Sequence, residues 1–458
     1  MKSCEPPQSA GAACSGAAWM ARYVGITVLC DYVISEGVDA VLANLLKLGA
    51  SAVAVNPTVT TEAAEGEAGA SWQPPSDGGT SPRLFDRPLF GKRSLWVRSG
   101  SSYTPRAELY EGCAYQPKPP NDLTEKHGHV IAEFIRRALA AGLEVYLQVG
   151  GCGGLGFPGL RDEDRPHMPD GTVTWDRMAD TASLASPGIR EYNAAYCKDL
   201  LLEYPGITGF RIDWPEYPCY TWEELFADFN PHVAHWAAEH GYDFDGIHAD
   251  VTALEKYLTT EMSDSDLSQL ESPDRGAPLL WSNAIASPGV MAWLKLKGAL
   301  CVDLIQDWRR AIDAATPAGS ATVQLHAHAF MPPWTLFTGL DFAGIAPFVD
   351  AISPKLYTMH WAQMITYWVS GFPPFLLHVH CTFTRVCFTS PRFDSNLPFD
   401  DQATHILERN SNVTESALIK ARDSHRNPHH NPHHNPHHNP RHNAATLVPG
   451  DVSERSRL

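Results

Sequence analysis

Apolar and polar residues follow one another along this chain in a repeating strand-and-helix order. Residues 23–30, 51–59 and 143–151 form apolar runs rich in β-branched side chains, which is typical of strands buried on both faces of a parallel sheet. Residues 38–49 and 129–142 carry apolar side chains at helical spacing, and each of these segments ends at a glycine. The pattern therefore predicts successive β–α–β units.

The same order continues through the middle of the chain. Ser186 is placed to cap a helix whose first position is Pro187 and which ends near residue 204. A strand follows within residues 207–218, and a long helical pattern covers residues 290–315. Two further predicted strands, 322–330 and 349–357, bring the total to six.

A parallel barrel of this type closes with eight strands, because only closure removes the edges of the sheet. Residues 375–388 offer either a seventh strand or a hairpin, and the chain beyond them is polar and irregular. We therefore predict an α/β fold of the TIM-type (β/α)8 barrel class over residues 22–388, with strands seven and eight in question.

Two stretches are too long for simple connections and are predicted to be insertions in the barrel. Residues 61–125 are rich in Gly, Pro and Ser, and residues 219–288 have helical patterns and follow strand four, where they would roof the barrel mouth. We expect disorder in the leader, residues 1–21, and in the tail, residues 389–458. The tail contains repeated Asn-Pro-His-His tetrapeptides, which cannot pack a core.

Charge and cysteine content restrict the classes of partner. The formal net charge of −17 repels phosphate backbones and anionic membranes, so neither a nucleic acid nor a membrane is an expected partner. The ten cysteines are scattered without a CxxC pair, which favours reduced thiols. No basic start is followed by an apolar leader segment, and no run approaches the roughly 18 apolar residues of a membrane span. These features predict a cytoplasmic protein.

Candidate chemistry gathers at the end of the fourth strand, in residues 211–217. Alternation along a strand places Arg211 and Asp213 on one face, and charge on the inward face of a barrel is tolerated near the open end. Pro215 ends the strand and leaves Glu216 in the following loop. Glycosidic bond hydrolysis uses two carboxyl groups, so Asp213 and Glu216 are its candidates. The competing interpretation is a structural Arg211–Asp213 ion pair beside a solvent-exposed Glu216.

Several positions give the chain a resemblance to a known family. They lie in the helix and strand of residues 182–218 and in the strand of residues 349–361, and comprise Pro187, Arg190, Tyr192, Gly209, Asp213, Asp350, Pro354 and Tyr357. In these motifs residues 22–370 resemble the uncharacterised glycosyl-hydrolase-like (β/α)8 barrels. The resemblance implies a barrel with a glycosidase site at its carboxyl-terminal mouth.

Other strand ends supply side chains suited to binding sugar hydroxyls. The predicted substrate-binding residues are Asn56, Gln148, Arg211, His326, His328, Trp334, Lys355, Tyr357, His360 and Trp361. Lys355 is suited either to an acidic sugar or to a neighbouring Asp. The pair His326 and His328 has the spacing of two metal ligands, but no third ligand is specified, so we expect neither a metal nor another cofactor.

The sequence thus favours a glycoside hydrolase acting on an oligo- or polysaccharide, with Glu216 as proton donor and Asp213 as base or orienting group. Retaining barrels place a second carboxylate after strand seven, and residues 372–388 contain no Asp or Glu. This departure leaves open inversion, a carbohydrate-binding barrel without catalysis, or an inactive truncated homologue. A metal-dependent hydrolase using His326 and His328 is the remaining alternative.

Overall fold

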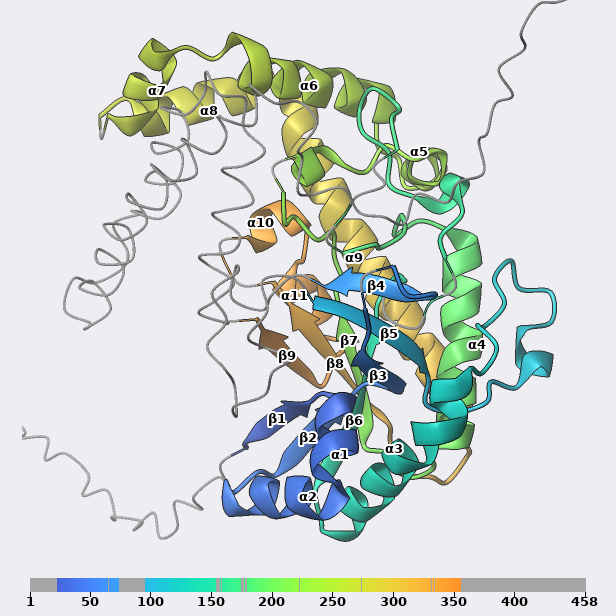
Figure 1. The fold of residues 1–458 in the computed structure, drawn as a ribbon. Helices are drawn as coiled ribbons and strands as arrows, with labels where there is room; N and C mark the ends of the chain where they lie inside the picture. Colours follow the sequence, from blue (N-terminus) through green and yellow to red (C-terminus); the bar gives the residue numbers. More distant parts are fainter. Residues whose placement is uncertain are drawn as a thin grey trace, which may run out of the picture.

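A six-stranded parallel sheet forms the centre of the molecule (Figure 1). The computed structural model describes residues 23–355 except 65, 74–94, 154–156, 158, 174–176, 178, 222, 273, 331 and 333. The strands lie in the order β1 (Gly25–Val28), β2 (Ala52–Val55), β6 (Glu144–Gly150), β7 (Gly209–Asp213), β8 (Gln324–Ala329) and β9 (Ala351–Pro354). Each of the six strands predicted from the apolar pattern is present.

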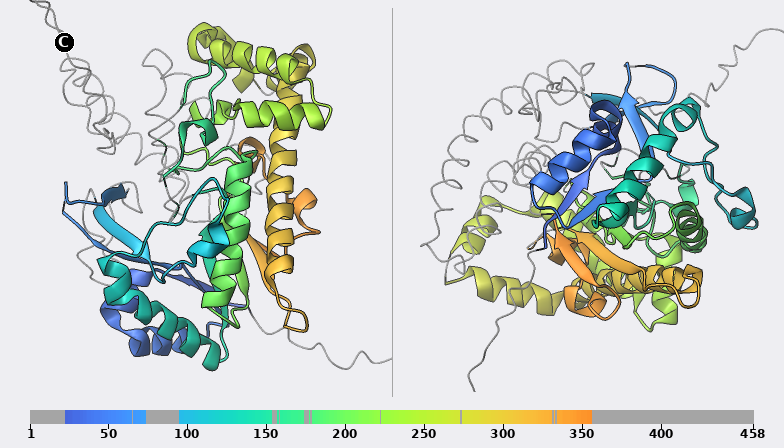
Figure 2. Two further views of the ribbon diagram at one scale, coloured as in Figure 1. Left: turned by 90° about the vertical axis from the view of Figure 1, so that its right-hand side faces the viewer. Right: turned by 90° about the horizontal axis from the view of Figure 1, so that it is seen from below.

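The sheet is curled rather than flat and forms a half-barrel (Figure 2). All five neighbouring pairs are parallel, and their registers place Gln148 beside Arg211 and Asp213 beside His328. The α/β class is therefore confirmed, and the described strands account for part of the predicted eight-stranded barrel. The candidate strand 375–388, the leader 1–21 and the tail 389–458 lie outside the described residues.

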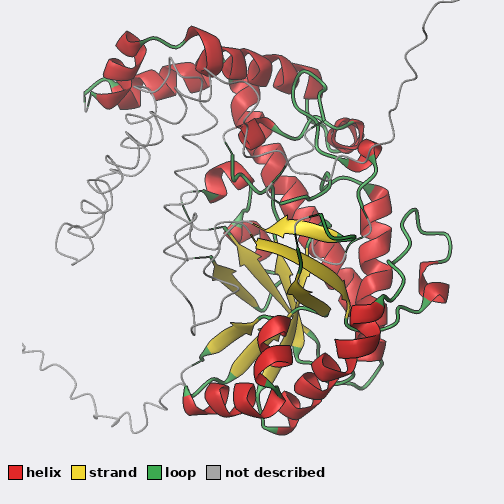
Figure 3. Cartoon of the chain, viewed as in Figure 1, coloured by secondary structure: helices red, strands yellow, loops and turns green. Residues whose placement is uncertain are grey.

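Helices cover the outer face of the sheet (Figure 3). They are α1 (Cys30–Glu36), α2 (Val38–Lys47), α3 (Asp122–Ala140), α4 (Pro187–Glu203) and α9 (Pro288–Ala315). As predicted, α4 begins at Pro187 behind Ser186, whose hydroxyl accepts a hydrogen bond from the amide of Ile189 at 3.3 Å. On β7, Phe210 and Ile212 are fully buried on this outer face, and the ring of Trp308 in α9 lies 6.3 Å from that of Phe210.

Several predicted boundaries were wrong. The second strand ends at Val55 and not at residue 59, since a separate strand, β3 (Thr58–Glu62), begins at Thr58, and α3 begins at Asp122 and not at residue 129. The first strand also ends earlier than predicted. The apolar run 23–30 suggests a strand through Cys30, but β1 ends at Val28 and Cys30 begins α1. Gly37, with φ of 85°, then separates α1 from α2. Short apolar runs do not distinguish a buried strand from the first turn of a buried helix, which explains the error.

The excursion of residues 61–125 contains a second sheet rather than only a loop. Its antiparallel strands lie in the order β3 (Thr58–Glu62), β5 (Leu95–Ser101) and β4 (Ala70–Gln73), followed by a short 3-10 helix η3 (Ala107–Tyr110). This sheet packs on α3. The approach is close at Gly128, where an added Cβ would lie 2.5 Å from the carbonyl oxygen of Ser102.

Residues 219–288 are mainly helical, in keeping with their sequence pattern. They form η5 (Glu223–Phe226), α5 (Pro231–Glu239), α6 (Phe244–Lys256), the π-helical turn η6 (Tyr257–Glu261), α7 (Asp264–Glu271) and α8 (Gly276–Ala286). This segment begins after the carboxyl end of β7, and the second sheet begins after the carboxyl end of β2, so both begin at the same edge of the half-barrel. Within the described part of the chain, no helix has the length and apolarity needed to cross a membrane.

Candidate active site on the inner face of the half-barrel

The inner face of the half-barrel carries polar side chains along most of its strands. Barrel interiors are ordinarily filled by layers of branched apolar side chains. Here alternation along the strands instead directs a polar set inward: Asn56, Gln148, Arg211, Asp213, His326, His328, Ser353 and Lys355. A polar interior of this kind is suited to a binding or catalytic site.

Asp213 ends β7 and forms an ion pair with Lys355, which follows β9. The amide of Gln148 donates to Asp213 Oδ2 at 3.1 Å, and the backbone amide of Trp214 donates to Oδ1 at 3.0 Å. Burial alone would raise the pKa of Asp213, but the charge of Lys355, together with that of Arg211, brings it below its ordinary value. Asp213 is therefore an ionised carboxylate at neutral pH, and its side chain keeps 18% exposure.

The turn after Asp213 has an uncommon backbone. Trp214 has φ of 50°, a left-handed conformation that costs energy for a bulky residue and is found disproportionately at functional sites. Its indole ring lies beneath the ammonium of Lys355, 4.9 Å from Nζ to the ring centroid. Gly151 accommodates this turn, because a Cβ there would lie 2.7 Å from the carbonyl oxygen of Trp214.

Arg211 is held by neutral partners. Its Nη1 donates to the hydroxyl of Thr27 at 2.5 Å, and its Nη2 lies 2.7 Å from Nδ1 and 3.1 Å from Nε2 of His328. Nδ1 of His328 also lies 3.1 Å from the carbonyl oxygen of Ser353. Burial, with the positive charges of Lys355 and Arg211, lowers the pKa of His328 to about 3. This histidine is therefore neutral.

Glu216 lies three positions beyond Asp213 and is completely buried. Its Oε1 accepts a hydrogen bond from the backbone amide of Phe330 at 2.6 Å, and its Oε2 accepts one from the hydroxyl of Thr338 at 2.5 Å. Burial raises the pKa of Glu216 to about 7, although these hydrogen bonds and Lys355 act in the opposite direction. The interpretation of Glu216 as a solvent-exposed loop residue is therefore wrong.

The other predicted residues occupy different parts of the half-barrel. Asn56 donates to the carbonyl oxygen of Gln148 at 3.0 Å and so lies beside the site. His326 lies two residues before His328 on β8 and is therefore nearer the amino ends of the strands. Its ring stacks on that of Tyr146, with the ring centroids 4.2 Å apart. Trp334 is buried, with 4% exposure, before the short helix α10 (Thr335–Thr338). Tyr357, His360 and Trp361 lie outside the described residues.

Three residues that form hydrogen bonds in the site were not predicted from the sequence: Thr27, Ser353 and Thr338. Alternation along β1 and β9 could have placed Thr27 and Ser353 on the inner face. Nothing in the sequence connects Thr338 with Glu216, 122 residues away. Among the described residues, no cluster of three or more His, Cys, Asp or Glu side chains has the arrangement of a metal site.

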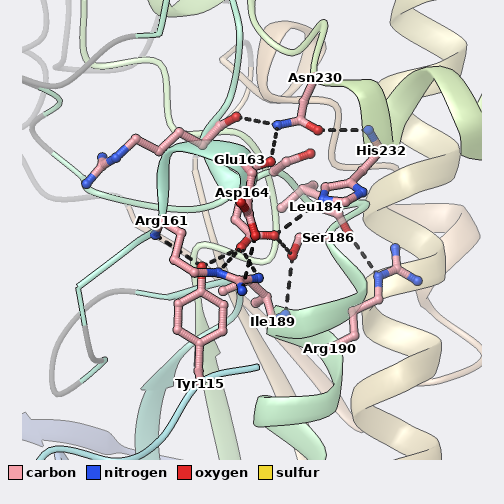
Figure 4. A network of polar contacts seen from close by, with 12 residues as sticks. Tyr115, Arg161, Glu163, Asp164, Leu184, Ser186, Ile189, Arg190, Asn230 and His232 are labelled. Carbon is pink, nitrogen blue, oxygen red and sulfur yellow. Dashed lines mark hydrogen bonds and ion pairs between the residues drawn. The ribbon is translucent and has the colours of Figure 1, made fainter. Parts of the chain in front are cut away.

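A buried network fixes the loop between β6 and α4, above the carboxyl end of the sheet (Figure 4). Its centre is Asp164, which is 1% exposed. Tyr115 and Ser186 donate to its two oxygens at 2.6 Å and 2.5 Å, and Arg161 donates at 2.8 Å. Burial opposes these donors, but together they hold the pKa of Asp164 below its ordinary value. The loop is thereby joined to the first turn of α4.

Comparison with known proteins found solved structures that resemble this chain only at low sequence identity and low TM-score. No protein-family model matches the chain, and no curated protein matches it significantly. The glycoside hydrolase domain of PgaB (BpsB) from Bordetella bronchiseptica is 11% identical, with a TM-score of 0.40, over 76% of this chain and 80% of that chain. The β-galactosidase from the psychrophilic Marinomonas ef1 is 12% identical, with a TM-score of 0.39.

That alignment covers 73% of this chain but only 41% of the β-galactosidase. The catalytic domain of β-amylase from Paenibacillus polymyxa is 9% identical, with a TM-score of 0.33, over 76% of this chain and 90% of that chain. Similarities of this extent assign neither a family nor an activity to the chain.

Proposed function

We propose that this protein hydrolyses glycosidic bonds of an oligo- or polysaccharide at the inner face of the half-barrel. One observation carries the proposal: Asp213 and Glu216, three positions apart, lie in environments that shift their pKa values in opposite directions. The pKa of Asp213 is lowered and that of Glu216 is raised to about 7. Two carboxyl groups with pKa values driven apart are the arrangement that general acid–base hydrolysis of a glycoside requires.

The environments of the two groups suggest their roles. Glu216 carries a proton over much of the range below neutral pH and is the donor to the leaving oxygen. Asp213, ionised beside Lys355, is the base or the carboxylate that stabilises positive charge on the sugar. Glu216 reaches a substrate only if its contact with the Thr338 hydroxyl opens on binding, because both its oxygens are now occupied. Gln148 and Arg211 are suited to hold sugar hydroxyls.

Turnover of a panel of aryl-glycosides and polysaccharides tests this assignment. Wild-type protein is compared with Asp213→Asn, Glu216→Gln and the control Glu133→Gln, which alters a carboxylate of 41% exposure on α3. We expect each of the two site variants to lose at least about 100-fold in kcat, as removal of a general acid or base does, while the control keeps its rate. Equal turnover in Glu216→Gln and wild type, with both folded, overturns the acid role.

A second function, carbohydrate binding without cleavage, is favoured by the complete burial of Glu216. If Phe330 and Thr338 hold this carboxyl group permanently, the site has one accessible carboxylate, Asp213, and lacks its acid. Calorimetry that detects oligosaccharide binding, with no product after prolonged incubation, would support this second function and contradict the first.

A further inference from the structure

Arg211 differs from the other arginines in the interior of the described structure in having no carboxylate partner. Arg177 pairs with Glu224 at 3.2 Å, and Arg190 pairs with Asp303 at 2.6 Å. The described contacts of Arg211 are the hydroxyl of Thr27 and the neutral ring of His328. A largely buried cation with no carboxylate in direct contact is costly, and the nearby Asp213 is already paired with Lys355, so the position favours a further anion.

Two buried polar atoms at this position lack a hydrogen-bond partner in the described structure. Nε of Arg211 and Oε1 of Gln148 are buried and have no hydrogen-bond partner among the described residues. The two side chains are register partners on β7 and β6, and therefore neighbours on the inner face. The orientation of the Gln148 amide is fixed, because its Nε2 donates to Asp213 and its oxygen must point away. The pair thus offers a charged donor beside a neutral acceptor.

The charges around this pair leave a positive balance. Arg211 and Lys355 are cations, Asp213 is ionised, and the lowered pKa of His328 keeps its ring neutral. At pH 6 Glu216 holds its proton for the most part, since its pKa is raised to about 7. The inner face near the carboxyl ends of the strands is then locally cationic, whereas Glu144 adds a carboxylate nearer their amino ends, in a chain whose formal net charge is −17. An anionic ligand is favoured at this face, although the molecule as a whole repels anions.

We propose that the site takes an acidic saccharide, with the anionic group of one sugar ring on Arg211 and a neighbouring hydroxyl on Gln148. This inference rests on the proposed function in that both concern the same inner face. A hexuronic acid has the required chemistry, because its carboxylate accepts from Nε of Arg211 while an adjacent hydroxyl donates to Oε1 of Gln148. The ion pair of Lys355 with Asp213 lies beside this position, because Gln148 also donates to Asp213.

Calorimetric binding at pH 6 and low ionic strength tests the proposal. The probes are oligosaccharides of galacturonate, glucuronate and mannuronate, each compared with its carboxyl-reduced counterpart, which keeps the ring configuration and loses the charge. A neutral oligosaccharide that carries sulfate esters is a further probe. Comparing its affinity with that of the uronate probes shows whether the site prefers a carboxylate or a sulfate ester. We expect at least one acidic probe to bind at least about tenfold more tightly than its uncharged counterpart, since a charge-assisted hydrogen bond is worth this much.

Variants connect the preference with Arg211. Arg211→Gln should reduce the tenfold preference to about one, Arg211→Lys should keep part of it, and the matched control Arg136→Gln, at a side chain of 68% exposure, should leave it unchanged. If Arg211→Gln does not fold, the salt dependence of wild type serves instead, because added NaCl should weaken binding of the acidic probe more than that of its reduced form.

The outcomes separate this inference from the hydrolase proposal. Binding of acidic probes without cleavage supports the acidic-saccharide site and contradicts hydrolysis. Cleavage of a neutral saccharide that binds as tightly as every acidic probe supports hydrolysis and overturns the acidic-saccharide site. Binding of none of the saccharides also overturns it.

Discussion

At the residue scale, Asp213 and Glu216 illustrate how two carboxyl groups in one short segment acquire different chemistry. Asp213 lies on the inner face and meets the ammonium of Lys355, whereas Glu216 is enclosed by Phe330 and Thr338 and meets no cation in an ion pair among the described contacts. Desolvation acts on both groups, and the nearby positive charge outweighs it at Asp213 alone.

Replacing Lys355 should lower the free energy of unfolding, because Asp213 would then be a buried carboxylate without its ion-pair partner. Because the pKa of Asp213 is lowered in the folded state, its stabilising effect is present above its ordinary value of 3.8 and is lost as the pH falls. Lys355→Met should therefore reduce the free energy of unfolding by about 3 kcal/mol at pH 7, the typical cost of breaking a buried ion pair, and by less at pH 3.5. Urea unfolding at both pH values measures this. An equal loss at both would contradict the pairing.

Glu216 should give stability the opposite dependence on pH. Its pKa is raised from 4.5 to about 7, so the folded state binds the proton more tightly, and the free energy of unfolding falls as the pH rises between these values. The contribution of this group is about 3 kcal/mol across the interval. In Glu216→Gln this part of the slope should disappear. Denaturation of both proteins at pH 5, 6 and 7 checks it, and parallel slopes would show that Glu216 has an ordinary pKa.

Strand alternation was sufficient to predict which charged residues share the inner face. Arg211 and Asp213 lie on that face, and Phe210 and Ile212 pack outward. The pairing of Lys355 with a nearby Asp was among the expected alternatives and is confirmed. The burial of Glu216 could not be predicted, because the groups that enclose it come from 114 and 122 residues further along the chain.

At the element scale, the carboxyl ends of β6 and β7 depend on one close backbone approach. The amide of Gly151 donates to the carbonyl oxygen of Asp213 at 2.7 Å, and its Cα faces the backbone of Trp214 and Pro215. A side chain at position 151 would push the turn after Asp213 away from the sheet. This contact positions the carboxylate of Asp213 at the mouth of the half-barrel.

Gly151→Ala should therefore destabilise the protein by about 2 kcal/mol, the cost of overpacking a tight site, because its Cβ would lie 2.7 Å from the Trp214 carbonyl oxygen. Gly159→Ala is the matched control in the same loop, since no heavy atom lies within 4 Å of a Cβ built there. Thermal or urea unfolding of the two variants gives the comparison. Similar stability of both would argue against the close approach.

The loop between β6 and α4 depends on Asp164. In Asp164→Asn an amide NH2 would face the hydroxyl and guanidinium donors of Tyr115, Ser186 and Arg161, so we expect a loss of about 3 kcal/mol in the free energy of unfolding. Asp162→Asn, at an exposed neighbouring carboxylate, should change stability little. Urea unfolding at pH 7 measures both. If Asp162→Asn lowers the free energy of unfolding as much as Asp164→Asn does, the effect comes from the charge of the loop in general and not from the hydrogen bonds of Asp164.

The long regular elements were predictable and the short ones were not. The helices α4 and α9, the part of α3 after residue 128 and all six strands of the half-barrel follow from apolar spacing, with the start of α4 given by its capping residue Ser186. The strands β3, β4 and β5 were missed, because Gly, Pro and Ser dominate residues 61–125 and conceal short strands whose partners are other parts of the same excursion.

At the scale of the whole molecule, the curled sheet gathers side chains from all six strands onto one polar face. Thr27 on β1, Arg211 on β7 and His328 on β8 form one set of contacts across it. Asn56 after β2, Gln148 on β6, Asp213 on β7 and Lys355 after β9 form a second set. The sequence predicted the carboxyl-terminal mouth as the position of the site from the strand-four end, with further polar residues at other strand ends. The contacts among these strands depend on curvature, which the linear pattern does not contain.

The most direct test of the site is a carbon-13 NMR titration of the carboxyl groups, with Asp213→Asn and Glu216→Gln used to assign the two resonances. We predict that Asp213 titrates below its ordinary value of 3.8 and Glu216 at about 7. Values for both groups near those of free carboxyl side chains, about 4, would contradict a matched base and acid at Asp213 and Glu216.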